Sequence, residues 1–164
     1  PQQVFPPATS APFGGPAPAG TPVANAAQAD ALLSFNVVLP SDVTPQYMNV
    51  YKWDGRELLQ AYYDTASNGL YDLSEEPTTW SVSDLQQRAD DWSTGSAQIV
   101  TVHGVHVLVG FDNVTPGGET DVAWIRGDGA SPVVTWLTGP WVEGQSFTTR
   151  QALSVAADII GQGG

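Results

Sequence analysis

YMNVYKWDGRELLQAYY, residues 47–63, is the stretch that decides the fold of this chain. Two runs rich in aromatic and β-forming residues flank the dipeptide Asp54-Gly55. An Asp-Gly pair between such runs is typical of a two-residue hairpin turn, in which both central residues take a positive φ. The sequence therefore predicts a β-hairpin with strands at residues 47–53 and 56–63.

Other strands are predicted on both sides of this hairpin. Leu33, Phe35, Val37 and Leu39 alternate with their neighbours up to Pro40, which predicts an opening strand. The remaining predictions are a turn at Asn68-Gly69 before a strand at 70–73, a hairpin of 97–102 and 105–111 around His103-Gly104, and strands at 121–126 and 133–137 around the loop 127–129.

Two helices interrupt this pattern. Ser83 and Gln86 have the spacing of a capping box, which predicts a helix running to about Trp92. Thr148 and Gln151 have the same spacing, and the helix that they begin is expected to close at Gly161. Its apolar residues recur at helical spacing: Leu153, Ala156, Ala157 and Ile160. We therefore expect an α+β fold, with an antiparallel, twisted sheet, the C-terminal helix packed on one face and one short additional helix.

The composition changes near Asp30. Residues 1–29 hold seven of the thirteen Pro and no charged side chain, so we expect an extended Pro/Ala/Gly-rich arm or linker there and a single domain over 30–164. One interpretation is a linker to a membrane anchor. The other is an arm that packs on a neighbouring subunit, with Phe5 and Phe13 in a groove of the partner. The chain begins with Pro, so a signal or anchor segment, if there is one, is expected upstream.

The charge balance excludes several classes of partner. Seventeen acidic residues against one Lys and four Arg give a net charge of −12, which argues against binding to nucleic acid or to an anionic membrane surface. Apolar runs such as residues 105–109 are too short to span a bilayer. With no Cys, the chain has no disulfide, thiolate nucleophile or Cys-based metal site.

No constellation typical of catalysis is found in the sequence. His103 and His106 are the only histidines, and a zinc site needs three or four ligands. A G-x-S-x-G motif is absent. The adjacent carboxylates Glu75-Glu76 and Asp90-Asp91 are expected to point apart into solvent. We therefore expect a protein without catalytic residues or cofactor.

Calcium is the most plausible ion. Residues 112–121 place Asp112, Glu119 and Asp121 around a Gly-rich loop, and calcium favours six to eight oxygen ligands. The spacing differs from that of an EF-hand, so these three residues are weak candidates and a plain polar loop is the alternative.

The chain contains six Trp, and most of its aromatic side chains are expected in the core. Trp141 is a candidate for contact with a partner, beside Phe5 and Phe13. If Trp141, Trp53 and Tyr51 are exposed on one sheet face, they form a protein interface or a stacking platform for sugar rings.

The order of elements resembles the bacterial domain family DUF4367, which is related in style to the extracytoplasmic parts of anti-sigma-factor regulators. The resemblance covers about residues 33–160 and is carried by short motifs: Leu39-Pro40, Val43-Thr44-Pro45, 59–63, Val102-His103-Gly104, Trp136, Gly139-Pro140-Trp141 and the helix 148–160. The family usually has Tyr where Trp141 stands. The resemblance implies a domain outside the cytoplasmic membrane and supplies no catalytic residue.

These patterns support three hypotheses. The first is a non-catalytic extracytoplasmic interaction domain, exported or membrane-tethered, that senses or binds another cell-envelope protein. The second is a structural subunit of an extracellular or membrane-bound assembly, whose N-terminal arm packs on another copy or another subunit. The third is a secreted glycan-binding module.

Overall fold

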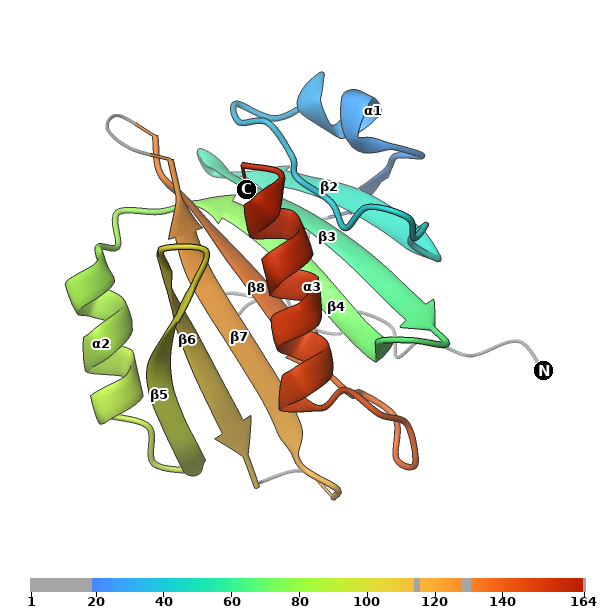
Figure 1. Cartoon of the computed structure of the whole chain (residues 1–164). Helices are drawn as coiled ribbons and strands as arrows, with labels where there is room; N and C mark the ends of the chain where they lie inside the picture. The colour runs from blue at the N-terminus through green and yellow to red at the C-terminus, as the bar shows by residue number, and fades with distance from the viewer. Residues whose placement is uncertain (1–18, 114–115, 128–130, 164) are drawn as a thin grey trace.

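The computed structural model describes residues 19–113, 116–127 and 131–163 (Figure 1). In chain order the elements are β1 (Thr21–Pro22), α1 (Ala26–Asp30), β2 (Tyr47–Trp53), β3 (Arg56–Thr65), β4 (Gly69–Pro77), α2 (Val82–Asp90), β5 (Gly95–Val102), β6 (Val105–Asp112), β7 (Glu119–Arg126), β8 (Val133–Gly139) and α3 (Thr149–Gly161). The strands form one open sheet in the order β1-β2-β3-β4-β8-β7-β6-β5, and every neighbouring pair is antiparallel. The predicted α+β class is confirmed.

Both predicted hairpins form with tight turns. Trp53 pairs with Arg56 across the turn at Asp54-Gly55, whose φ values of 47° and 74° are those expected of a primed turn. The β5–β6 turn at His103-Gly104 repeats this geometry, with φ values of 47° and 82°.

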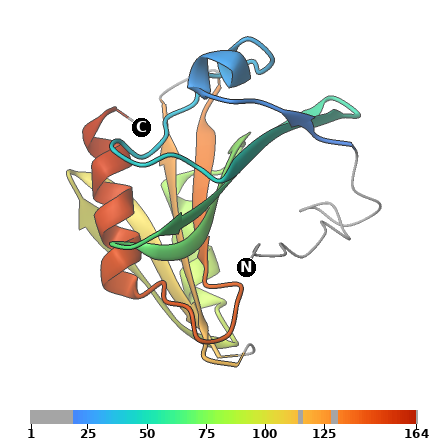
Figure 2. The ribbon, with the colours of Figure 1, turned by 90° about the vertical axis from the view of Figure 1, so that its right-hand side faces the viewer.

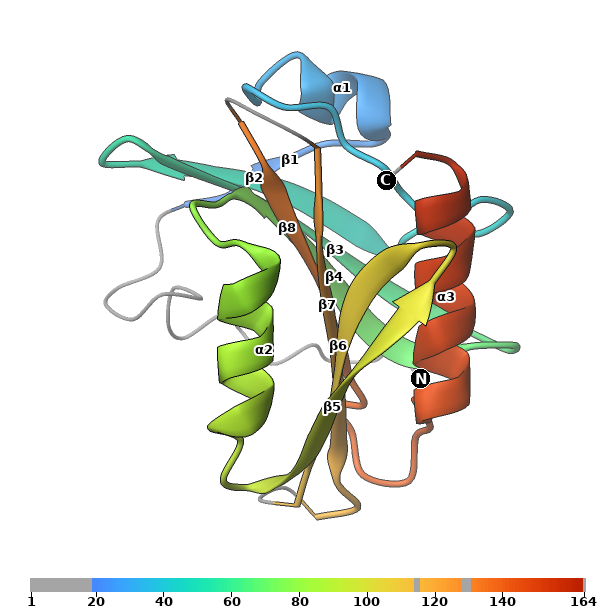
Figure 3. The same ribbon diagram turned by 60° about the vertical axis from the view of Figure 1, so that its left-hand side comes forward.

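The C-terminal helix covers one face of the sheet, as predicted, and α2 covers part of the other (Figure 3). The larger core cluster lies between α3 and the sheet and includes Leu73, Trp124 and Ile159, each fully buried. The smaller cluster joins Leu85 and Ala89 of α2 to Leu108 and Ala123 of the sheet. Side chains alternate between the two faces along each strand, so the sheet has two apolar sides of unequal extent.

The caps of the two main helices decide where each begins. Thr148 and Gln151 form the predicted capping box of α3, but Gly161 is the last helical residue rather than the stop, and Gln162 is the C-cap. The prediction for α2 was wrong in detail: its capping box joins Ser81 and Asp84, not Ser83 and Gln86, and the helix ends at Asp90. Asp84, at the third helical position, takes the capping role that was expected of Gln86. Its carboxylate accepts a hydrogen bond from the Ser81 amide at 2.6 Å.

The opening strand predicted at residues 33–39 does not form. The segment is irregular and buries Phe35 and Val37, but it pairs with no strand of the described chain. Three carboxylates accept its amides instead. The Ser34 amide donates to Glu57 at 2.9 Å, the Val37 amide to Asp30 at 2.7 Å and the Val38 amide to Glu75 at 3.3 Å. The alternating pattern therefore predicted correctly that Phe35 and Val37 are buried. Its backbone amides donate to side-chain carboxylates and not to the carbonyls of a neighbouring strand.

The segment then joins the C-terminal end of α3 (Figure 2). The Ser41 amide donates to the Asp158 carboxylate at 2.7 Å, and the Gln162 side chain donates to the Leu39 carbonyl at 3.2 Å. Two ordered elements, β1 and α1, also begin before Asp30, the residue at which the composition changes and α1 ends. Residues 1–18, which include Phe5 and Phe13, lie outside the described residues.

Candidate functional site

Exposed apolar side chains gather at the end of the sheet where α3 begins. Among the described residues, five large hydrophobic side chains are exposed, and three of them are Phe111, Trp141 and Val142. Phe111 pairs with Thr120, and Thr120 pairs with Gly139, so β6, β7 and β8 reach this end in register. Trp141 and Val142 follow directly after β8. Two segments distant in sequence thus meet at one edge of the molecule.

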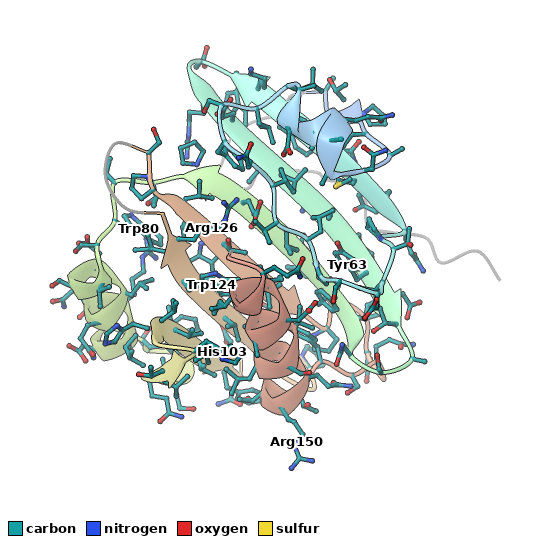
Figure 4. The ribbon with its side chains drawn as sticks, turned by 45° about the horizontal axis from the view of Figure 1, so that its top comes forward. Tyr63, Trp80, His103, Trp124, Arg126 and Arg150 are labelled. Carbon is teal, nitrogen blue, oxygen red and sulfur yellow. The ribbon has the colours of Figure 1, made fainter. Side chains whose placement is uncertain are left out.

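A groove of about 500 Å³ opens at the same end, and we call it the α3 groove. Its walls combine the apolar residues Phe111, Pro140 and Phe147 with Thr148 and Arg150 at the start of α3. Phe147 is buried at the base, where its ring stacks on Tyr71 at 4.8 Å between centroids. Arg150 projects outward from the first turn of the helix (Figure 4). The groove therefore has an apolar floor and a polar rim, as protein interfaces do.

The loop that forms one side of the α3 groove is fastened to the turn between β3 and β4. The Leu70 amide donates to the Ser146 carbonyl at 2.9 Å, and the Gln151 side chain donates to the Ser67 carbonyl at 3.2 Å. Gly69 lets the two segments approach this closely: a Cβ there would lie 1.7 Å from the Ser146 oxygen, and its φ is +75°. The shape of the groove thus depends on residues that do not line it.

A second groove, of about 590 Å³, lies beside α2, and we call it the α2 groove. It is lined by Trp80 and Trp92 together with carboxylates that include Asp84 and Asp91. The Arg88 guanidinium lies 3.7 Å from the centre of the Trp80 ring and covers one face of that ring. Trp92 lies against Gly110 of β6, where a Cβ would meet the indole at 2.6 Å.

Four carboxylates lie along the sheet face that points away from α3. Asp112 pairs with Glu119 in the β6–β7 ladder, and Asp121 and Asp72 both pair with Thr138 of β8. Burial, together with the negative charges of the neighbouring Asp121, Asp112 and Asp72, raises the pKa of Glu119 to about 7. Burial likewise raises the pKa of Asp72 and of Asp121 to about 6 each, against hydrogen bonds from Gln60 and Thr138. We call these four residues the carboxylate row.

The three weak calcium candidates, Asp112, Glu119 and Asp121, do lie together in this row. Over the described ranges, however, no three His, Asp or Glu side chains are arranged to hold a metal ion. Sequence reasoning missed Asp72, which belongs to a strand far from the loop. Only the register of β4 with β8 brings it close to Asp121.

The two pairs of adjacent carboxylates, Glu75-Glu76 and Asp90-Asp91, differ in burial. Glu75 and Glu76 point to opposite faces, as expected, but Glu75 is fully buried rather than solvated. Its carboxylate pairs with Arg126 at 3.0 Å and also accepts from the Thr135 hydroxyl at 3.3 Å. Asp90 and Asp91 are exposed at the end of α2 and accept hydrogen bonds from Gln86 and Gln87.

The proposed aromatic platform is not formed. Tyr51 and Trp53 share one face of β2, but Tyr51 is only 8% exposed. Trp53 lies at the β2–β3 turn, whereas Trp141 follows the far end of β8, so the two Trp residues lie at opposite ends of the sheet. His103 is exposed in its hairpin turn, and His106 is exposed on β6.

Comparison with known proteins returns no match to a protein-family model, to a curated protein or to a solved structure. The resemblance to DUF4367 therefore stays a prediction. Within the described ranges, no helix combines the length and the apolar character needed to cross a membrane.

Proposed function

We propose that the chain is a non-catalytic extracytoplasmic domain that binds another cell-envelope protein through the α3 groove. The observation that carries this proposal is the gathering of Phe111, Trp141 and Val142 beside an open groove. Exposed large apolar residues that are scattered singly need no explanation, but a cluster at a groove is typical of a binding surface.

The residue types at the α3 groove are those that dominate binding energy in protein interfaces. Trp and Arg are enriched among hot-spot residues; Arg150 lines the groove, and the exposed Trp141 directly follows Pro140 of its lining. The partner that fits is a segment that inserts an apolar side chain over Phe111 and Phe147 and offers an acceptor to Arg150. A carboxylate acceptor on the partner would give a charge-assisted hydrogen bond.

The test is capture of a partner from the envelope fraction of the organism that makes this protein, with the full chain as bait. We expect a protein that the wild-type chain retains and that Trp141→Ser and Phe111→Ser each lose. Val82→Ser is the matched control, because Val82 is 47% exposed on α2, outside the α3 groove. Equal capture by all four baits would refute the groove as the binding site. Capture of further copies of the chain alone would instead favour the assembly subunit.

Glycan binding is the second candidate, and the α2 groove favours it. Two Trp side chains beside carboxylates and amides are groups that stack on sugar rings and bond their hydroxyls. Arg88, however, already occupies one face of the Trp80 ring. Retention of the full chain on an insoluble polysaccharide, and its loss in Trp92→Ser, would support this candidate. No retention on any glycan tested would eliminate it.

A further inference from the structure

The sheet has one protected edge and one open edge. At the protected edge, β1 is only two residues long and ends with Pro22, and the neighbouring β2 carries the exposed Lys52. Short edge strands, prolines and lysines are devices by which proteins prevent a strand of another molecule from pairing with a sheet. The open edge is β5, which has eight residues and contains neither Pro nor Lys. Among the described residues, no strand pairs with the outer side of β5.

Every second residue of β5 directs its backbone groups to the open edge. In a two-residue hairpin the residues that flank the turn form a hydrogen-bonded pair, here Val102 and Val105. Because such pairs alternate along an antiparallel ladder, the even-numbered residues of β5 direct their backbone groups to β6. The Thr94 carbonyl, which accepts the Asn113 amide at 2.9 Å, follows the same alternation. The outward-facing backbone groups are therefore those of Ala97, Ile99 and Thr101.

The apolar side chains of β5 are only half-buried, and this holds on both faces of the sheet. Ile99 packs against the cluster beneath α2, while Val100 and Val102 pack against the cluster beneath α3. The two helices lie on either side of β5 and leave its outer edge open between them (Figure 3). A further strand along β5 would bury more of these side chains and would also pair the outward backbone groups.

The hairpin of β5 and β6 carries no formal charge, although the chain as a whole carries −12. No Asp, Glu, Lys or Arg occurs between Asp91 and Asp112. Two copies of so acidic a protein repel each other, so a contact between them has to avoid the carboxylates. The β5 edge meets this requirement, and it offers a charged partner no group of opposite charge. An antiparallel copy of β5, in contrast, brings an acceptor to each outward amide.

We propose that two copies of the chain pair through β5, antiparallel about a twofold axis at Ile99, so that two eight-stranded sheets become one. Ala97 then pairs with Thr101 of the second copy, and the outward residues form about six hydrogen bonds across the axis. Only the protected β1 edges remain unpaired after this step, so the assembly closes as a dimer. No residue of β5 lines the α3 groove, so the proposal is independent of the proposed function.

Analytical ultracentrifugation of the full chain tests the dimer. The mass should rise from 17.3 kDa toward twice that value between about 1 µM and about 500 µM. Thr101→Pro removes an outward amide, and an edge strand tolerates proline at such a position. We expect its dimer Kd to rise about tenfold or more, whereas Thr101→Ala keeps the amide and should dimerise like the wild type. A wild-type chain that stays monomeric, or equal dimerisation of the two variants, would overturn the proposal.

Hydrogen exchange of the wild-type amides gives a second readout that requires no variant, so the proposal stays testable if Thr101→Pro fails to fold. In dilute solution the amides of Gln98 and Val100, which face β6, should exchange slowly. The outward amides of Ala97, Ile99 and Thr101 should exchange quickly there and become protected as the concentration rises. Protection of these three amides that does not depend on concentration would show that the edge is covered within one chain, and it would overturn the proposal.

Discussion

Arg126 and Glu75 form a buried ion pair between β7 and β4, with Nη2 3.0 Å from Oε2 and the glutamate fully buried. The same Arg126 nitrogen donates to the Asn36 carbonyl. Glu75 Oε2 also accepts from the Val38 amide, and Glu75 Oε1 accepts from the Thr135 hydroxyl. One charged pair therefore helps to fix the irregular segment 33–39 over the sheet. This segment closes the core beside α3 without being a strand itself.

Arg126→Ala is expected to destabilise the fold by about 3–5 kcal/mol near pH 8, because it leaves the Glu75 carboxylate buried without its cation. The free energy of unfolding in urea measures this loss. Arg150→Ala removes an exposed cation from α3 and should change stability by less than about 0.5 kcal/mol. The double change Glu75→Gln with Arg126→Met should recover much of the loss, since it leaves no buried charge. A small effect of Arg126→Ala would contradict the role assigned to the pair.

Stability is expected to rise as the pH falls from about 8 to about 5, opposite to ordinary acid denaturation. Burial raises the pKa of Asp72 to about 6 and that of Glu75 and Glu119 to about 7 in the folded chain. In this range the folded state binds more protons than the unfolded state, so rising pH costs stability. Thermal unfolding across this range measures the effect. Each unit by which folding raises the pKa of a fully buried carboxylate contributes about 1.4 kcal/mol, and solvent screening makes the contribution of the half-buried Glu119 smaller.

Asp72→Asn isolates one contribution to this pH dependence. The Asn side chain has the size of Asp and keeps a hydrogen bond to Gln60, but it cannot ionise. The variant should therefore be more stable than the wild type at about pH 8 and as stable as the wild type at about pH 5. Asp64→Asn, an exposed change on β3, serves as the control and should leave the profile unaltered. A pH profile that is the same for Asp72→Asn and wild type would show that Asp72 titrates outside this range.

Gly69→Ala should weaken partner binding although Gly69 itself does not line the α3 groove. The new Cβ would clash with the Ser146 carbonyl and would also force a positive φ on Ala, at a cost of about 1–2 kcal/mol or more. The loop that carries Trp141 would then lose its attachment to the β3–β4 turn. Capture of the partner should fall for Gly69→Ala and hold for Gly55→Ala, another positive-φ glycine whose Cβ would meet no atom within 4 Å. Equal loss in both variants would assign the effect to general destabilisation.

Much of the sheet could be predicted from local signals. Asp54-Gly55 and His103-Gly104 form turns whose geometry depends only on the residues in them, and both hairpins formed as expected. The start of α2 was misplaced because two serines compete for the cap two residues apart. Ser81 takes that role because Asp84 rather than Gln86 reaches back to its amide.

The non-local features could not be predicted in this way. Residues 33–39 have the alternation of a strand, but carboxylates from Asp30 and from the distant Glu57 and Glu75 accept three of their amides. Asp72 joins the carboxylate row through the pairing of β4 with β8, which no local pattern encodes. Trp141 was chosen from the sequence as a contact residue, but Phe111 comes to the same end of the sheet only through the register of β6, β7 and β8.

Photo-cross-linking inside the cell tests the binding role of the α3 groove most directly. A photoreactive phenylalanine analogue at Gln145, an exposed residue lining the groove, would react with a bound partner, and the same analogue at Val82 on α2 is the control. We predict one protein adduct from position 145 that is missing from position 82 and disappears when Trp141→Ser is added. Absence of an adduct at 145, or an identical adduct at both positions, would contradict the account.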